Sequence, residues 1–192
     1  MEQQKRIDAF SLEIGLIQNN AIRELVKEAL CIVPEYFFTV PASSTGKYHP
    51  QYSLGDGGLV RHTQAATRIA YELFRVDMFK YSQLEQDIML AALILHDTCK
   101  SGLEHSQYTK AEHPLIAAKL IREHDFLFGN EYKEDIAKCI ETHMGQWNTD
   151  YKTHQAILPL PQTKMQKFVH LCDYLASRKC LEFNFNAELS TR

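Results

Sequence analysis

The sequence contains no long hydrophobic run. Its longest uninterrupted apolar segment covers residues 88–95, far short of the roughly 20 residues that a helix needs to cross a bilayer. Its first six residues are polar, with no apolar signal-peptide core behind them. We therefore expect a soluble protein of the cytoplasm that has no membrane partner.

Paired cysteines and an excess of one charge are also missing. The five cysteines include no Cys-x-x-Cys pair, so they fit reduced thiols better than a disulfide framework or a structural zinc site. The formal net charge is only −3, which argues against a chain that coats nucleic acid. The 192 residues are 45% hydrophobic and 23% charged, and we expect a single globular domain over residues 1–192.

Hydrophobic periodicity predicts an all-α fold of about six or more helices. Apolar residues recur at helical spacing, and no long segment alternates with the period of a strand. The predicted helices cover residues 7–33 (in one piece or two), 59–73, 83–98, 114–123, 131–144 and 161–181. Proline and glycine interrupt the pattern over residues 34–58, which predicts a long loop. Residues 88–95 are apolar all round and should form the centre of the core.

Polar side chains interrupt the apolar faces of several predicted helices. A single histidine in such a place is more often a hydrogen-bonded core residue than a ligand. Buried carboxylates, however, are costly unless they are paired or bind a metal, and histidines together with carboxylates suit a divalent ion. The set predicts one polar pocket that binds metal. It comprises His62, His96, Asp97, His143 and Asp173.

The order of these residues resembles the signature of the HD-domain superfamily of metal-dependent phosphohydrolases. The matching motifs, over about residues 57–178, are Gly57-Gly58 before His62, His96-Asp97-x-x-Lys100, His113-Pro114, His143 and Asp173. The resemblance implies an HD-type helical bundle with a metal-binding core at 59–182, preceded by helix at 1–33 and followed by a tail at 183–192.

The resemblance also implies a ligand set for one or two divalent transition ions. In the family, the first ion is bound by the counterparts of His62, His96, Asp97 and Asp173. In binuclear members, the counterparts of His113 and His143 complete a second site, and the counterpart of Asp97 bridges the two ions. The implied metals are Mn, Fe, Co, Ni or Zn, with Mg as a further candidate. Asp97 and Lys100 would then be the catalytic residues.

Four side chains are candidates for substrate binding, each with a plainer alternative. Lys100 either reaches a substrate phosphate or is a solvated lysine at a helix end. Lys47 and His49 belong to a segment that either approaches phosphate or is a polar connection. Arg178 either clamps phosphate or caps a solvated helix face.

Three other histidines need separate interpretation. His113 precedes a proline at a predicted helix N-terminus, where it serves either a metal or a phosphate, and we expect it at the pocket rim. His124-Asp125 is a second His-Asp pair, but Phe128 stands where the lysine would be, so we interpret it as a solvated helix end. His170 is predicted to support the site from behind or to lie at the surface.

The leading functional hypothesis is hydrolysis of a phosphoester or phosphoanhydride bond. The resemblance favours a phosphorylated small molecule, a nucleotide or an oligonucleotide end as substrate, and it leaves the oligomeric state open. One alternative is a diiron oxygenase similar to myo-inositol oxygenase. Another is a nuclease, because Pro41-Ala42-Ser43 and Gly57-Gly58-Leu59 resemble the HD region of one class of conjugative relaxases. A third is a nucleotide-binding module without catalysis.

Overall fold

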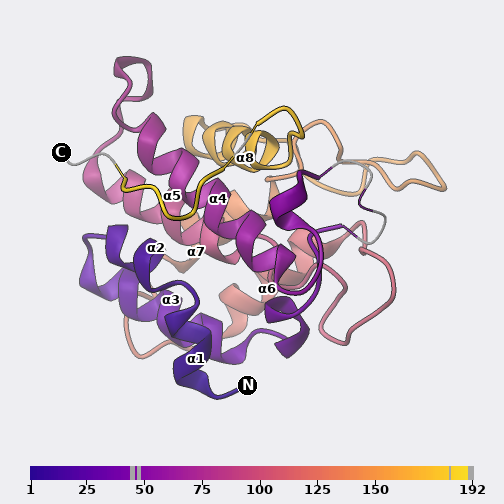
Figure 1. Cartoon of the computed structure of the whole chain (residues 1–192), viewed down its shortest axis with the longest axis horizontal. Coiled ribbons are helices and arrows are strands. Elements are labelled where there is room, and N and C mark those ends of the chain that lie inside the picture. The colour runs from indigo at the N-terminus through magenta and orange to yellow at the C-terminus, as the bar shows by residue number, and fades with distance from the viewer. Residues whose placement is uncertain (44–45, 47–48, 182, 190–192) are drawn as a thin grey trace.

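The computed structural model describes residues 1–43, 46, 49–181 and 183–189. Within them the chain is helical, with no strand apart from a single bridge between Thr149 and Ala156, so the predicted all-α fold is confirmed (Figure 1). The α-helices are α1 (Gln3–Asp8), α2 (Ser11–Leu16), α3 (Asn20–Ile32), α4 (Gly58–Leu73), α5 (Gln83–Leu95), α6 (His113–Glu123), α7 (Lys133–Glu141) and α8 (Lys164–Ala176). Among the described helices, each is too short or too polar to cross a membrane.

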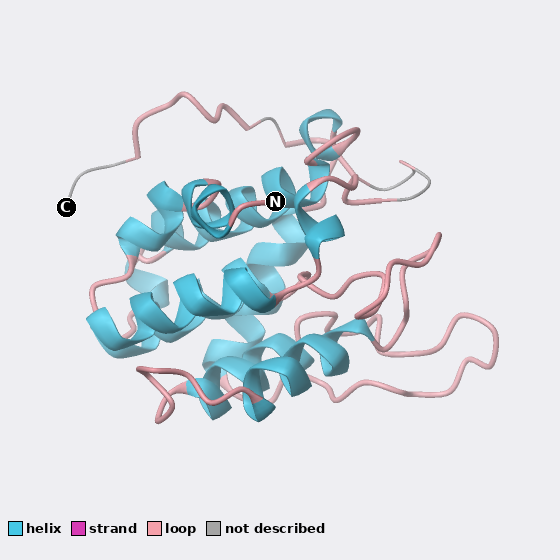
Figure 2. Ribbon diagram, turned by 90° about the horizontal axis from the view of Figure 1, so that it is seen from below, coloured by secondary structure: helices cyan, strands magenta, loops and turns pink. Residues whose placement is uncertain are grey.

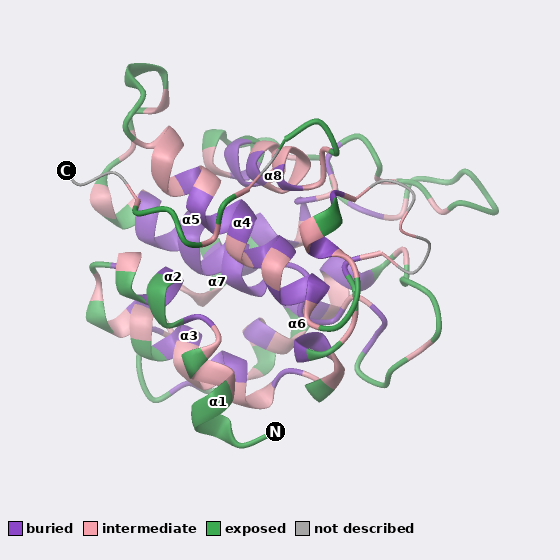
Figure 3. Ribbon diagram, viewed as in Figure 1, coloured by how far each residue is buried: buried purple, intermediate pink, exposed green. Residues whose placement is uncertain are grey.

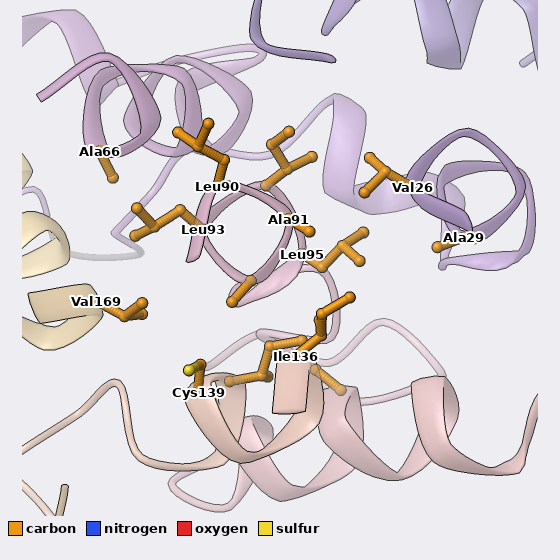
Figure 4. Close-up of a cluster of buried hydrophobic side chains, with 14 of the residues drawn as sticks. Val26, Ala29, Ala66, Leu90, Ala91, Leu93, Leu95, Ile136, Cys139 and Val169 are labelled. Carbon is orange, nitrogen blue, oxygen red and sulfur yellow. The ribbon is translucent and has the colours of Figure 1, made fainter. Parts of the chain in front are cut away.

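Helix α5 is the centre of the bundle, as its apolar sequence predicts. Every residue from 86 to 95 is buried, and Figure 3 shows the helix buried along most of its length. It packs against α2, α3, α4, α7 and α8. Figure 4 shows its side chains pointing outward in several directions, toward Ala66 on α4, Ile136 on α7 and Val169 on α8. A helix surrounded in this way holds its C-terminal end in a fixed place.

The N-terminal segment forms three helices rather than the predicted one or two. Asn19 is the N-cap of α3, and its side-chain oxygen accepts hydrogen bonds from the N–H groups of Ala21 and Ile22 at the start of that helix. The buried Asp87 of α5 accepts two further bonds, from the N–H groups of Gln18 at 3.0 Å and Asn19 at 2.8 Å. This break depends on a residue far away in the sequence, so local periodicity did not show it.

Helices α5 and α7 end earlier than predicted, and this places the polar residues that follow them in turns. Helix α5 ends at Leu95 and α7 at Glu141. Side chains beyond each end satisfy the last free carbonyl oxygens: the hydroxyl of Thr98 donates to Leu95 O at 2.8 Å, and that of Thr142 donates to Lys138 O at 2.9 Å. His96, Asp97 and His143 therefore lie just past the helices to which they were assigned.

Helix α8 is shorter than the predicted 161–181. Thr163 begins it with a capping box, in which the Thr163 hydroxyl accepts from Gln166 N–H and the Gln166 side chain accepts from Thr163 N–H. Sequence periodicity alone did not detect this cap. The helix ends at Ala176, close after the predicted ligand Asp173.

Glycine sets the start of α4. Gly57 has a φ of +67°, which L side chains rarely adopt. At Gly58 a Cβ atom would lie 2.2 Å from the carbonyl oxygen of Ser53, so only glycine fits. The segment before it is a loop with two short 3₁₀ helices, η1 (Glu35–Phe38) and η2 (Gln51–Ser53). Figure 2 shows that the longest loops leave the helices on one side of the molecule.

Candidate metal centre

The structure brings the six residues of the implied ligand set into one buried cluster between α4 and the ends of α5, α6, α7 and α8. Asp97 is at its centre and is 1% exposed. Its Oδ2 atom lies 3.5 Å from His96 Nε2 and 3.7 Å from His62 Nε2. Its Oδ1 atom lies 3.1 Å from His113 Nε2 and 3.7 Å from His143 Nε2. One carboxylate thus faces four imidazoles.

Asp173 closes the cluster from α8. Its Oδ1 atom lies 2.9 Å from His62 Nε2 and 3.4 Å from His96 Nε2. Among the described residues, two triplets have ligand atoms within 4.8 Å of one another: His62, His96 and Asp173, and His96, Asp97 and His143. The first triplet falls inside the set that the resemblance assigns to a first ion, and the second connects that set to His143.

Three histidines are oriented by the same backbone contact. His96, His113 and His143 each direct Nδ1 at the carbonyl oxygen of the residue three positions earlier. The acceptors are Leu93, Lys110 and Ile140, at 2.7, 2.8 and 2.7 Å. A carbonyl oxygen only accepts, so Nδ1 carries the proton and donates it. Nε2 then points into the cluster, where it can bind a metal in its unprotonated form, and metal-binding histidines are usually held in this way.

The cluster also contains buried polar atoms without hydrogen-bond partners in the described structure. His96 Nε2 and Asp97 Oδ1 are two of them. A buried polar atom without a partner costs about 1–3 kcal/mol, so two in one cluster indicate a missing partner. Imidazole nitrogen and carboxylate oxygen together suit a divalent transition ion. The residues therefore fit the implied metal, although the assignment of individual ligands stays a prediction.

Both carboxylates are held in the ionised form. Burial alone raises the pKa of Asp97, but Lys100 and His96 beside it keep that pKa well below its usual range. Burial likewise opposes ionisation of Asp173, and His62 and His96 beside it hold the pKa of Asp173 well below its usual range. Ionised carboxylates are the form that binds metal.

The histidines differ in charge. Burial lowers the pKa of His143 to about 3, and the neighbouring His96 acts in the same direction. Burial also disfavours the charged form of His96, but Asp97 and Asp173 raise the pKa of His96 above its usual value. His143 is thus neutral and ready to bind, whereas His96 has to release a proton first.

His113 lies inside the cluster, so its expected place at the pocket rim is wrong. It is 1% exposed, and its Nε2 atom lies 3.2 Å from His143 Nε2. The physical reason is that α6 begins at His113 with Pro114 in its first turn, and this helix start faces the ends of α5 and α7.

Of the predicted substrate-binding residues, Lys100 and His49 lie at the cluster. Lys100 Nζ lies 2.5 Å from Asp97 Oδ2 and its side chain is only 14% exposed, so it is not a solvated lysine. The half-buried ring of His49 meets that of His62, with 5.2 Å between centroids. Burial, and next the charge of Lys100, lower the pKa of His49 to about 3. His49 is therefore a neutral polar group there. Lys47 lies outside the described residues.

Arg178 caps the end of α8. Its Nε atom donates to Tyr174 O at 3.2 Å and its Nη2 atom to Ser177 Oγ at 2.7 Å. The guanidinium lies 4.3 Å from the centre of the Tyr174 ring. These contacts match the capping alternative, and a role in substrate binding stays a prediction.

The second His-Asp pair lies outside the cluster, as predicted. His124 follows the last residue of α6, and its Nε2 atom lies 2.8 Å from Glu28 Oε1. It is paired with Glu28 rather than simply solvated, which corrects part of the prediction. Asp125 is exposed.

His170 supports the site, as one of the two predictions for it stated. It donates from Nδ1 to the carbonyl oxygen of His143 at 2.7 Å.

Sequence reasoning missed Tyr36, whose hydroxyl accepts from Ser101 N–H at 2.9 Å and donates to Gly102 O at 2.6 Å. Tyr36 thereby holds the turn that carries Lys100, and the sequence contains no spacing signal for this contact.

Comparison with known proteins gives one match. A family model described as HD domain matches residues 59–178, close to the 57–178 over which the motifs were found. The matched region contains all six residues of the cluster. No curated protein and no solved structure matches the chain.

Proposed function

Because this chain belongs to the HD-domain superfamily of metal-dependent phosphohydrolases, we propose that it hydrolyses a phosphoester or phosphoanhydride bond in a nucleotide or an oligonucleotide. The observation that carries the proposal is the shared orientation of His96, His113 and His143. Each has its proton fixed on Nδ1 and directs Nε2 at the region around Asp97. Five helices and two carboxylates maintain this arrangement, which a merely structural core would not need.

Different residues of this chain would make different contributions to such a reaction. A divalent ion, when bound, supplies Lewis acidity toward a phosphoryl oxygen and makes water a nucleophile near neutral pH. Asp97 belongs to the second triplet, and its carboxylate also lies next to His62 of the first triplet, so it connects the two. Lys100 brings a positive charge next to Asp97, where it can stabilise charge that develops on a phosphoryl oxygen. No protein nucleophile is required.

A groove next to Lys100 offers a route for the substrate. It has a volume of about 290 Å³ and is lined by Lys100, Ser101, His105, Gln107 and Thr109 together with Val40, Pro41 and Ala42. Its lining combines one cation with polar and small apolar side chains. Lys100 gives this groove a positive charge that attracts the phosphate of a substrate.

The proposal is tested by metal analysis followed by a substrate panel. Purified protein is assayed with Mn²⁺, Fe²⁺, Co²⁺, Ni²⁺, Zn²⁺ or Mg²⁺ against mononucleotides, cyclic and dinucleoside phosphates and short oligonucleotides. We expect phosphate release or strand shortening with at least one metal, and its loss on chelation.

Two matched variants show whether metal binding and activity depend on this site. Asp97→Ala should remove metal and activity together, because the loss of this carboxylate leaves the imidazoles around it without their counter-ion. Asp125→Ala, in the other His-Asp pair, should change neither. An active, metal-replete Asp97→Ala protein would contradict the proposal. Dioxygen consumption by the iron form without any phosphate release would instead support the oxygenase.

A further inference from the structure

The chain has a single tryptophan, and it is exposed beside the metal centre. Trp147 follows the cluster residue His143 by four positions and is 46% exposed. The turn between them is closed by hydrogen bonds from Gly145 N–H to Thr142 O and from Trp147 N–H to Met144 O, each 3.1 Å. One short turn therefore directs an imidazole into the cluster and an indole out of it.

The indole is held in a fixed orientation even though it is exposed. Its ring stacks on that of Tyr174, with centroids 5.5 Å apart and an angle of 12° between planes. His170, one helical turn earlier on the same face of α8, lies 5.8 Å away. Gly145, at a φ of +56°, permits this approach, since a Cβ atom there would lie 2.3 Å from the His170 ring.

The surroundings of the indole are polar. The Nε2 atom of His170 lies 2.9 Å from Gln146 Oε1, and the Arg178 guanidinium lies 4.3 Å from the centre of the Tyr174 ring. A binding face for a protein helix would be a contiguous apolar patch. A single flat ring among polar groups, with a cation nearby, instead suits a flat aromatic ligand that carries negative charge.

The indole ring of Trp147 also lies next to residues that adjoin the metal cluster. Tyr174 is the residue after Asp173, and the His170 ring that flanks the indole donates to the backbone of His143. Trp147 therefore contacts the residue that follows one cluster carboxylate and the histidine that holds the backbone of a cluster imidazole.

We propose that Trp147 is the base-binding residue of this enzyme, with the nucleobase of the substrate stacked on the indole while the phosphate enters the metal cluster. The inference rests on the proposed function and names the part of the substrate that this ring recognises. Stacking of a base on an aromatic side chain tolerates all four bases. We therefore expect selection for a base, and little selection among bases.

Intrinsic fluorescence tests the contact directly, because Trp147 is the only tryptophan. Metal-loaded protein is mixed with adenosine 5′-monophosphate or with ribose 5-phosphate, and emission is recorded in the first seconds. We expect saturable quenching by the nucleotide and none by the sugar phosphate. Equal effects of the two ligands, or no effect of either, would overturn the inference.

Kinetics provide a second measurement with matched variants. Trp147→Ala should raise KM for a nucleotide substrate about tenfold, with kcat and metal content unchanged. Trp147→Phe should restore most of the affinity. Tyr151→Ala removes an aromatic that is 89% exposed in the same loop and should have no effect. An unchanged KM in Trp147→Ala overturns the base contact but leaves phosphohydrolysis intact, whereas absence of hydrolysis of every phosphoester in the wild type overturns the proposed function itself.

Discussion

The ammonium group of Lys100 lies 2.5 Å from Asp97 Oδ2, so the catalytic lysine candidate is an immediate neighbour of the central carboxylate. The two residues are one turn apart, and Tyr36 fixes the next backbone N–H through its hydroxyl. Lys100 therefore lies on the inner side of the groove rather than in solvent. From this position Lys100 can act either in turnover or in metal retention, and a substitution of Lys100 separates the two roles.

Lys100→Met should slow turnover while metal remains bound. Lys100 is not a metal ligand, but its charge is near the place where negative charge develops during phosphoryl transfer. The loss of such a group typically slows the reaction by about a hundredfold. Metal content and kcat are measured on the same preparation. Lys119→Met, which removes an equal charge from an exposed position on α6, is the control. If Lys100→Met lost metal in proportion to activity, the lysine would be holding Asp97 instead.

His113→Ala should lose one of two metal equivalents. His113 is buried, and its Nε2 atom lies 3.1 Å from Asp97 Oδ1, which favours a ligand over a phosphate contact at the rim. Metal stoichiometry is measured by elemental analysis of the purified protein. His154→Asn, in an exposed turn at a positive φ that asparagine tolerates, should keep both equivalents. Full metal content together with a raised KM would show that His113 contacts the substrate.

The metal-free protein should lose stability as the pH rises above about 6.5. The pKa of His96 is raised in the folded state by Asp97 and Asp173 against the effect of burial, so its contribution is fully present below about 6.5 and disappears as pH rises through the raised pKa. Asp97 and Asp173, whose pKa values are lowered, remain ionised over this range and add no slope.

Metal binding should respond to pH in the opposite direction. The ion needs neutral imidazole, so each proton released makes affinity rise by up to about tenfold per pH unit. Calorimetric melting with and without a chelator measures both effects, and the gap between the two melting temperatures should widen as pH rises. A chelated protein that grows more stable over this range would refute the charge assigned to His96.

Asp87→Ala should destabilise the fold without affecting the site. Its buried carboxylate accepts from the backbone N–H groups of the two residues before α3, and the loss of these hydrogen bonds costs about 2–4 kcal/mol. For a chain of this size the melting temperature should fall by about 5–15 °C. Metal content at low temperature should match that of the wild type. Asp77→Ala, at an exposed position in η3 (Asp77–Phe79), should leave the melting temperature unchanged; metal loss in Asp87→Ala would mean that the two regions are coupled.

The sequence by itself determined the elements that depend on local pattern. Residues 88–95 are apolar all round, and a helix of that kind has to be buried, whichever neighbours cover it. The start of α5 is also set locally, because Ser82 and Glu85 form a capping box there. Five of the six clustered residues were also readable, because polar groups on apolar faces need a partner, whereas His113 joined the set through the resemblance to the HD-domain superfamily.

Only the tertiary structure decided where those side chains lie relative to one another. The contact of His113 with Asp97 depends on how the start of α6 lies beside the turn that follows α5, and no spacing along the chain encodes that placement. The break before α3 requires Asp87, and the exposed face of Trp147 requires Tyr174 from α8. Helix ends and contacts between helices arise from packing of distant segments, whereas periodicity reports only on neighbours within a few turns.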